Sequence, residues 1–288
     1  MRFAVLLLAS FLAAPVLSAQ HTVPSGGQWL IEPSERSGIV RLTIRYGERR
    51  YSDNWNSQDD VPVSQLVGLS AADMRGSGVT VHFKIVRSAG TLDCEGWFDD
   101  GKGSGHFTYQ ANSDFAAELA KRGINGPPPT AWEQFQMTMA DVGLELVDEL
   151  ARQKYERPTA AELVRVRDHG VDPEFIASLD GVGYKNLGIE GLVRLRDHGV
   201  DGDYIADMKE MGYAPANSEE LIESRDHGVD PSYIVSLKQA GYENLSLQEL
   251  RRARDHGVTR GFIERVKARG YGKPTLDEVI RLRDRGLD

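Results

Sequence analysis

The 288-residue chain has only one cysteine, Cys94. A single thiol cannot form an internal disulfide, so the folded chain must be stabilised by packing. The neighbours of Cys94 are Asp93 and Glu95, and two anions disfavour the thiolate that a reactive cysteine needs. We therefore expect Cys94 to be a buried, unreactive residue of a strand.

The chain is also short of positive charge. It has 34 Lys and Arg against 43 Asp and Glu, which gives a net charge of -9. Nucleic-acid binding depends mainly on neutralisation of phosphates by a basic surface. We therefore expect no nucleic-acid partner.

Long hydrophobic runs are absent after the first twenty residues. The start, "MRFAVLLLASFLAAPVLSAQ", contains Arg2, an apolar run from Phe3 to Val16 and small residues before a cleavage point near Ala19, a pattern typical of an export signal. A transmembrane anchor is the alternative, but the run is shorter than the roughly 20 residues that span a bilayer. We predict a signal peptide at 1–19, an exported protein that is periplasmic or extracellular, and no integral membrane segment after cleavage.

Residues 20–111 have the pattern of strands. "GIVRLTIRY" and "VTVHFKIV" alternate apolar with polar residues, the period of half-buried strands. Asp100-Gly101 is a hairpin signal, for which we expect a loop that extends through Lys102 and Gly103. We predict a small antiparallel β-sheet domain, curled into a half barrel.

Residues 112–288 repeat themselves. Arg-Asp recurs at 167, 196, 225, 254 and 283, and Gly-Tyr recurs at 183, 212, 241 and 270, a constant step of 29 residues. A fixed period of this length predicts stacked repeats. The predicted fold class is therefore α+β, a small antiparallel β domain followed by an α-solenoid of short helix pairs.

Each repeat has the end signals of two helices. Thr159 and Glu162 form a capping box at the start of the first helix, and Gly170 has the position of a C-terminal cap. Asp172-Pro173 then begins the second helix as an N-cap followed by proline. The second copy has glycines in place of the capping box, so we expect a weaker start there.

The repeat pattern extends backwards in degenerate form. Subtracting 29 places Thr159 and Glu162 on Thr130 and Glu133, so 130–155 is predicted to be a copy without Arg-Asp-His. Phe115 and Gly123 keep the offset of a second helix still earlier, with "NGPPP" as the loop between helices.

The repeated Arg-Asp-His is the motif that most resembles a catalytic group. Asp168 falls in the last turn of its helix, where the helix dipole disfavours an anion, so it needs a partner. We expect this partner to be an arginine of the adjacent repeat or amides of the adjacent loop, with His169 bonding carbonyls at its own helix end. The predicted structural ladder comprises Arg167, Asp168, His169, Arg196, Asp197, His198, Arg225, Asp226, His227, Arg254, Asp255 and His256.

A metal site and a catalytic pair are the alternatives for this motif. Equivalent positions of stacked helices lie roughly 8–10 Å apart, whereas ligands of one zinc ion lie about 2.0–2.2 Å from it. Neighbouring residues of a helix point about 100° apart, so Asp168 would not orient His169 for catalysis. We predict no catalytic, metal-binding or cofactor-binding residues and no cofactor.

Three tryptophans of the β domain are the candidates for ligand binding, namely Trp29, Trp55 and Trp97. The alternative is that they are packed in the core or at an edge, the more common role of large aromatic residues. His106, in "GSGHFTY", is expected to be a strand residue that faces solvent.

The unit "RDHGVDPEFIASL", followed by Gly-Tyr and preceded by "AGTLDCEGWFDDGKGSGHFTY", resembles a known bacterial arrangement. It is similar to the extracytoplasmic extension behind some antirepressor metallopeptidases of the beta-lactam-sensor (BlaR/MecR) type, over roughly 27–288. The His-Glu-x-x-His of a peptidase is absent from the sequence, so the resemblance implies no peptidase activity. It implies a bacterial envelope setting and an accessory or sensing role.

The sequence therefore predicts an exported, non-enzymatic scaffold or sensing protein that binds a protein partner through its helical repeats. Residues 246–288 have 11 Lys and Arg against 7 Asp and Glu, so this end could face an anionic partner, although a solvated helix face is the simpler interpretation. The alternatives are a receptor for a small ligand or glycan that uses the β domain, and an unrecognised hydrolase, for which no motif is present.

Overall fold

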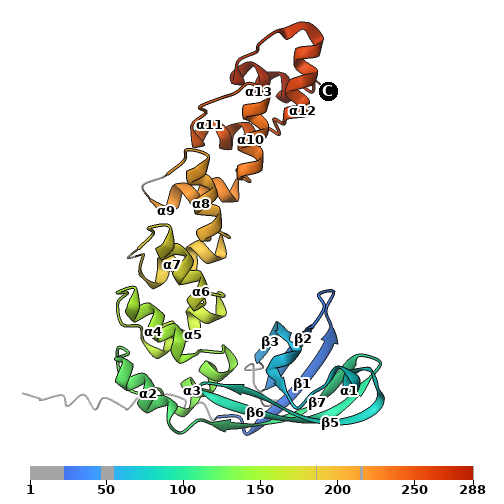
Figure 1. The fold of residues 1–288 in the computed structure, drawn as a ribbon, viewed down its shortest axis with the longest axis vertical. Coiled ribbons are helices and arrows are strands. Elements are labelled where there is room, and N and C mark those ends of the chain that lie inside the picture. Colours follow the sequence, from blue (N-terminus) through green and yellow to red (C-terminus); the bar gives the residue numbers. More distant parts are fainter. Residues whose placement is uncertain (1–22, 47–54, 186, 215–216, 288) are drawn as a thin grey trace, which may run out of the picture.

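A computed structural model describes residues 23–46, 55–185, 187–214 and 217–287. The predicted signal peptide at 1–19 lies outside these residues. The described chain forms a curled antiparallel sheet followed by a long stack of short helices, which confirms the predicted α+β class (Figure 1). Within the described ranges, no helix is both long enough and apolar enough to cross a bilayer.

The sheet has seven strands in the order β3-β2-β1-β7-β6-β5-β4, and every neighbouring pair is antiparallel. A short 3-10 turn and one short helix join its later strands. The elements are β1 (Gly26–Pro33), β2 (Ile39–Tyr46), β3 (Trp55–Pro62), η1 (Val63–Gln65), β4 (Leu66–Val67), α1 (Ala71–Arg75), β5 (Ser77–Arg87), β6 (Gly90–Asp99) and β7 (Lys102–Ala111).

The turn between β6 and β7 is tighter than the sequence predicted. Asp99 pairs with Lys102, so only Asp100 and Gly101 form the loop. Both have a positive φ, 47° and 83°, as a two-residue type I′ turn requires. The expectation of a loop through Lys102 and Gly103 was wrong because the backbone twist of this turn matches the twist of the two strands.

The inner face of the curled sheet forms one core. Trp29 is 1% exposed and contacts the edge of Phe83, with ring centroids 5.0 Å apart. Cys94 is fully buried in β6, and burial raises the pKa of its thiol to about 12. The expectation of a buried strand cysteine is thus confirmed, and the raised pKa disfavours the thiolate.

The helices follow the sheet in pairs. They are α2 (Phe115–Arg122), α3 (Ala131–Met139), α4 (Leu144–Arg152), α5 (Ala160–Asp168), α6 (Pro173–Gly181), α7 (Gly188–Asp197), α8 (Gly202–Glu210), α9 (Ser218–Asp226), α10 (Pro231–Gln239), α11 (Leu247–Asp255), α12 (Arg260–Val266), η2 (Lys267–Tyr271) and α13 (Leu276–Asp284).

The ends of these helices are set by the predicted side chains. Thr159 and Glu162 form a reciprocal capping box at the start of α5. Gly170, with φ 73°, ends the helix, and the Val171 amide donates to the Val166 carbonyl over 2.8 Å, which is a Schellman motif. The second repeat starts more weakly, as expected, because the N-cap of α7 makes no side-chain hydrogen bond.

The degenerate repeat connects the stack to the sheet. α3 begins with the predicted capping box of Thr130 and Glu133. Phe135 of this helix is fully buried in the sheet core, 4.5 Å between ring centroids from Tyr46. Gln134 donates from Nε2 to the Ala89 carbonyl over 2.8 Å. The first helix pair is therefore fixed to the sheet, and later pairs extend from it.

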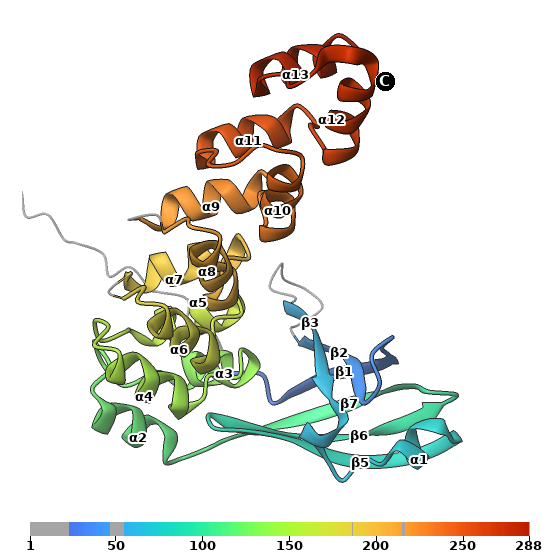
Figure 2. The ribbon, with the colours of Figure 1, turned by 45° about the horizontal axis from the view of Figure 1, so that its top comes forward.

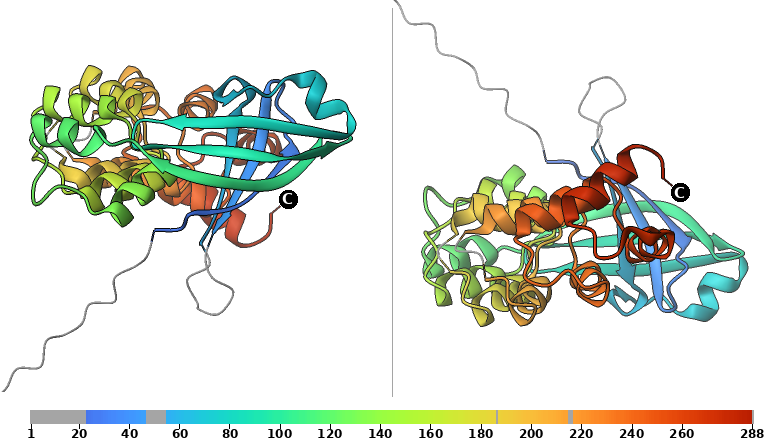
Figure 3. Two further views of the ribbon diagram at one scale, coloured as in Figure 1. Left: turned by 90° about the horizontal axis from the view of Figure 1, so that it is seen from below. Right: turned by 90° about the horizontal axis from the view of Figure 1, so that it is seen from above.

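The stack rises away from the sheet as a long arm. Its first helices lie at one end of the long strands, and its C-terminal helices lie far from the sheet (Figure 2). Seen along the stack, the first helix pairs lie to one side of the strands, and the last helices overlap the sheet in projection, so the stack leans over the sheet (Figure 3). The molecule therefore exposes a long, regular edge of repeats next to the sheet.

Candidate functional site

The repeated histidines and aspartates bond to one another across adjacent repeats. Nδ1 of each histidine lies 2.6–2.8 Å from Oδ1 of an aspartate 28 residues later. The four contacts, called rungs below, are His169–Asp197, His198–Asp226, His227–Asp255 and His256–Asp284. A ladder between repeats was expected, but two of its predicted bonds were wrong. The aspartate bonds the histidine of the preceding repeat, where an arginine or loop amides had been predicted. The histidine bonds this aspartate through Nδ1, where carbonyls at its own helix end had been predicted.

The rungs form because of where the two side chains lie in their repeats. His169 is the C-cap residue of α5, and Asp197 is the last residue of α7 in the next repeat. Their side chains are 38% and 42% exposed, so the contact lies at the edge of the stack. An imidazole that donates through Nδ1–H to a carboxylate leaves its Nε2 directed elsewhere, and the described residues supply no hydrogen bond to that nitrogen.

The arginines of the motif have a separate role. The guanidinium of Arg225 lies over the ring of Tyr204 in the preceding repeat, 4.8 Å from its centroid. The same contact joins Arg196 to Phe175, Arg254 to Tyr233 and Arg283 to Phe262. Arginine suits this place because its planar group stacks on aromatic faces.

Two of the aromatic residues under these arginines are tyrosines, and their hydroxyls form hydrogen bonds to the next repeat. Tyr204 donates its hydroxyl to the Val229 carbonyl over 2.9 Å, and Tyr233 donates to Val258 over 3.1 Å. Burial raises the pKa of Tyr204 to about 12, which keeps the hydroxyl protonated as a donor. In these two repeats, the hydroxyl bond therefore adds to the arginine contact in joining the repeat to the next one.

The first aspartate of the series has no rung. The residue 29 positions before His169 is Ala140, so Asp168 has no histidine below it. Instead it lines a pocket of about 370 Å3 between β3 and the first repeats, together with Asp59, Asp60, Arg87, Asp141 and Arg167. Although solvent reaches Asp168, its partial burial raises the pKa of this carboxyl, and the charge of Asp59 adds to this effect.

Arg87 is the buried charge of that pocket. Its side chain is 13% exposed and donates to the carbonyls of Thr138 and Met139, over 2.7 and 2.5 Å. Asp141, with φ 55°, brings its carboxylate to 3.6 Å from Arg87. These contacts neutralise a charge where the sheet meets the stack.

Two chemical uses of the rungs can be compared with this geometry. An aspartate that bonds Nδ1 of a histidine occurs in hydrolase triads, but the rungs lie in four copies along an open edge, and the described residues place no hydroxyl or thiol in hydrogen bond with Nε2. The structure also places no group of three His, Cys, Asp or Glu side chains to hold a metal ion within residues 23–46, 55–185, 187–214 and 217–287. What the arrangement does is join repeats.

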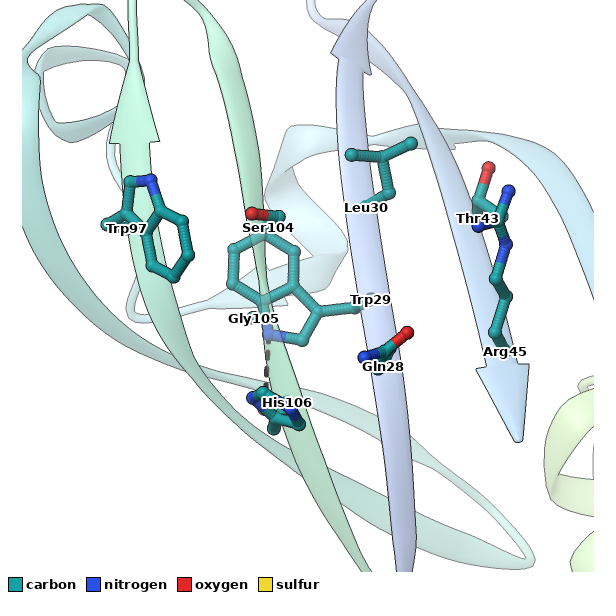
Figure 4. Close-up of a pocket in the computed structure, with 9 residues that line it drawn as sticks. All are labelled: Gln28, Trp29, Leu30, Thr43, Arg45, Trp97, Ser104, Gly105 and His106. Atoms are coloured by element: carbon teal, nitrogen blue, oxygen red, sulfur yellow. Dashed lines mark hydrogen bonds between the residues drawn. The ribbon is translucent and has the colours of Figure 1, made fainter. Parts of the chain in front are cut away.

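The three candidate tryptophans lie in different environments. Trp29 is in the core and donates from its indole nitrogen to the carbonyls of Glu95 and His106, over 3.1 Å each. Trp97 is 54% exposed on the other face of the sheet (Figure 4). The side chain of Trp55 lies outside the described part of the chain. His106 is exposed in β7, as expected.

A groove beside Trp97 contains residues that the sequence analysis missed. They are Gln28 of β1 and Arg45 of β2, which line the same groove as Trp97 and His106 (Figure 4). Their convergence depends on the strand order β2-β1-β7-β6. Alternation within one strand indicates which face a residue occupies, but it does not indicate which distant strand lies beside it.

The C-terminal repeats expose positive charge. Five basic side chains there are exposed and form no ion pair among the residues that the structure describes. They are Arg265, Arg269, Lys273, Arg281 and Arg285. Tyr271, between two of them in the sequence, is 50% exposed.

No protein-family model, curated protein or solved structure matches the chain.

Proposed function

We propose that this chain is an exported, non-enzymatic interaction protein that uses its helical stack as a scaffold for a protein partner. The stack suits this role because each repeat from α5 onward is tied to the next by a rung, an arginine stacked on an aromatic ring and, in two repeats, a buried tyrosine hydrogen bond. Such contacts keep a long surface in fixed register. The predicted export signal at 1–19 and the resemblance to extracytoplasmic sensor extensions support the proposed place in the bacterial envelope.

The observation that carries the proposal is the unpaired basic surface of the last repeats. Three exposed arginines of one column of the stack are paired with the next repeat: Arg165 with Glu190, Arg252 with Asp277, and Arg194 with Glu219 over 2.8 Å. Arg265, Arg269 and Arg281 are exposed without such a partner among the described residues. Unpaired charge on a rigid surface steers a complementary partner, so we infer an acidic protein surface as the partner.

Site-specific photo-crosslinking of the full chain in its native cells tests this proposal. A photoreactive phenylalanine analogue replaces Arg269, and a matched variant carries the analogue at Arg75, an exposed arginine of α1. We expect a discrete protein adduct from position 269 alone, and its yield should fall with rising salt. Absence of an adduct at 269, or equal adducts at both positions, would contradict the proposal.

The proposed export has a separate test. N-terminal sequencing of the protein purified from its native cells should begin after Ala19, and fractionation should recover the mature chain outside the cytoplasm. A chain that retains Met1 and remains in the cytoplasm would refute export without bearing on the crosslinking result.

A further inference from the structure

The outer face of the sheet carries two neighbouring rows of side chains from four strands. In the first row, Gln28 is paired with Arg45 on one side and with His106 on the other. In the second row, Leu30 is paired with Thr43 and with Ser104, and Ser104 is paired with Trp97. The two rows line one groove of about 220 Å3 (Figure 4).

The groove has a firm base. Thr43 is 5% exposed and Leu30 is half-buried, and they form its floor. Behind it, the Trp29 ring occupies the space that Gly96 leaves, since a Cβ on Gly96 would lie 2.6 Å from that ring. The Trp29 indole also bonds the backbone of both β6 and β7. The strands that carry Trp97 and His106 are thus held in place before any ligand arrives.

The walls of the groove combine one flat apolar surface with free polar groups. Trp97 and Arg45 lie at opposite sides of it (Figure 4). Within the described residues, the side chains of Gln28, Arg45 and His106 make no hydrogen bond or ion pair. A large exposed aromatic with convergent, unoccupied polar groups is the arrangement of a binding site rather than of a solvated strand.

The ligand can be specified from this chemistry. The electron-rich face of an indole attracts polarised C–H groups, while the amide, guanidinium, hydroxyl and imidazole bond hydroxyl groups. Among the described residues, Arg45 is the one Lys or Arg side chain that lines the groove, and Glu95, the cross-strand partner of His106, adds a carboxylate to the same row, so the groove has no cluster of cations for an anionic ligand. The groove is smaller than the roughly 300–1,000 Å3 of pockets for drug-sized ligands, so it accepts one ring.

We propose that this groove binds a neutral saccharide, with one sugar ring stacked on Trp97 and its hydroxyls bonded by Gln28, Arg45 and His106. This site is separate from the helical stack, so the proposal does not depend on the interaction function given above.

Titration of the full chain with neutral trisaccharides tests the proposal. The probes are the trimers of N-acetylglucosamine, glucose in β-1,4 linkage, glucose in α-1,4 linkage and mannose, followed by isothermal titration calorimetry and by the indole N–H signals in NMR. We expect saturable binding of at least one trimer at millimolar concentration or below, with a shift of the Trp97 signal.

Variants make the test specific. Trp97→Ala should weaken binding about tenfold or more, and Trp97→Phe should weaken it less, because an aromatic face remains. The control Tyr271→Ala removes another half-exposed aromatic, on the stack, and should leave binding unchanged. The proposal is overturned if no trimer binds, if binding survives Trp97→Ala, or if a proline-rich peptide binds at Trp97 and the saccharides do not.

Discussion

His198 Nδ1 lies 2.8 Å from Oδ1 of Asp226, and this contact is one of those that join the second repeat to the third. Asp226 is the last residue of α9, a position where the helix dipole disfavours an anion. The imidazole of the preceding repeat offsets that cost. The acidic residue is therefore explained by the stacking of repeats, and no reaction is needed to account for it.

A double-mutant cycle measures this contact. His198→Ala and Asp226→Ala should show a coupling energy of about 0.5 kcal/mol in the free energy of unfolding at pH 7, because a half-exposed hydrogen bond to a carboxylate contributes about 0.2–1 kcal/mol. Urea unfolding at low salt gives the value. The pair His198→Ala and Asp255→Ala, taken from different rungs, is the control and should show no coupling.

A related outcome would reject the structural role. If Asp197→Ala left stability unchanged while abolishing metal uptake or turnover, the rungs would be reagents and the ladder an incidental arrangement.

Asp168 has no rung, so we expect its replacement by asparagine to have the opposite effect on stability from the same replacement at a rung aspartate. Its carboxyl has a raised pKa in the folded chain, first because of partial burial and then because of the charge of Asp59. Asp168→Asn should therefore stabilise the protein at pH 7, by a few tenths of a kcal/mol since solvent screens so exposed a group. Asp226→Asn, in the same column of the repeat, should destabilise it.

The pH dependence gives a second measurement of the same effect. Because the folded chain holds this proton more tightly than the unfolded chain, stability falls as pH rises from the unfolded pKa of about 3.9 to the raised folded pKa. The difference in unfolding free energy between Asp168→Asn and the wild type should therefore vanish at acidic pH and be complete at neutral pH. A difference that is constant with pH would contradict this explanation.

The repeat architecture could be predicted because its signals are local. Capping boxes, C-terminal glycines and Asp-Pro starts each lie within a few residues, and the step of 29 placed even the degenerate helix that begins after Thr130. The partner of Asp197 could not be predicted in this way. It depends on the rotation and rise between repeats, which bring the last residue of α7 to His169 while Arg196 stacks on Phe175.

The groove on the outer face of the sheet could not be predicted from the sequence, because it too depends on how distant segments are arranged in space. Trp97 was a candidate, but Gln28 and Arg45, two of the polar residues in its groove, come from β1 and β2, more than fifty residues away in the chain. Only the insertion of β1 between β2 and β7 brings Gln28 beside His106. Trp29, the other described candidate, supports the groove from the core side.

The buried hydroxyl of Tyr204 offers a test of the aromatic row. Tyr204→Phe keeps the ring under Arg225 but leaves the Val229 carbonyl without its side-chain donor. We expect a loss of about 1 kcal/mol in the free energy of unfolding. Arg225→Lys, which keeps the charge and loses the planar stack, should cost about 0.5–1 kcal/mol.

These two effects should combine in a specific way. Because the hydroxyl bond and the stacked guanidinium lie on different parts of the same ring, Tyr204→Phe should leave the cost of Arg225→Lys nearly unchanged. A cost of Arg225→Lys that disappears in the Phe background would show that the arginine acts through the hydroxyl and not through the ring.

In most repeats an arginine forms an ion pair with an acidic residue of the next repeat. One repeat lacks this arginine, and a different ion pair takes its place. Arg165 pairs with Glu190 over 2.9 Å, and Arg194 with Glu219 over 2.8 Å. In the third repeat the arginine is replaced by Glu223.

The acidic partner of the pattern is replaced as well. Gln248 stands where the acid would be, which avoids two facing carboxylates. Glu223 pairs instead with Arg251 over 3.1 Å, from a position that is Val164, Val193, Ile222 or Ile280 in the other repeats. Three substitutions together have therefore preserved one contact between repeats.

Restoring the common pattern stepwise tests that interpretation. Glu223→Arg alone should lower the free energy of unfolding by about 0.5–1 kcal/mol, because it removes a pair and places a second cation beside Arg251. The triple variant Glu223→Arg, Gln248→Glu, Arg251→Ile should recover wild-type stability or exceed it, since the Arg251 side chain is only 17% exposed and an isoleucine there buries apolar area. Urea unfolding of both variants measures the two free energies of unfolding. If the triple variant is no more stable than Glu223→Arg, the three substitutions did not compensate for one another, and the charges between repeats act independently.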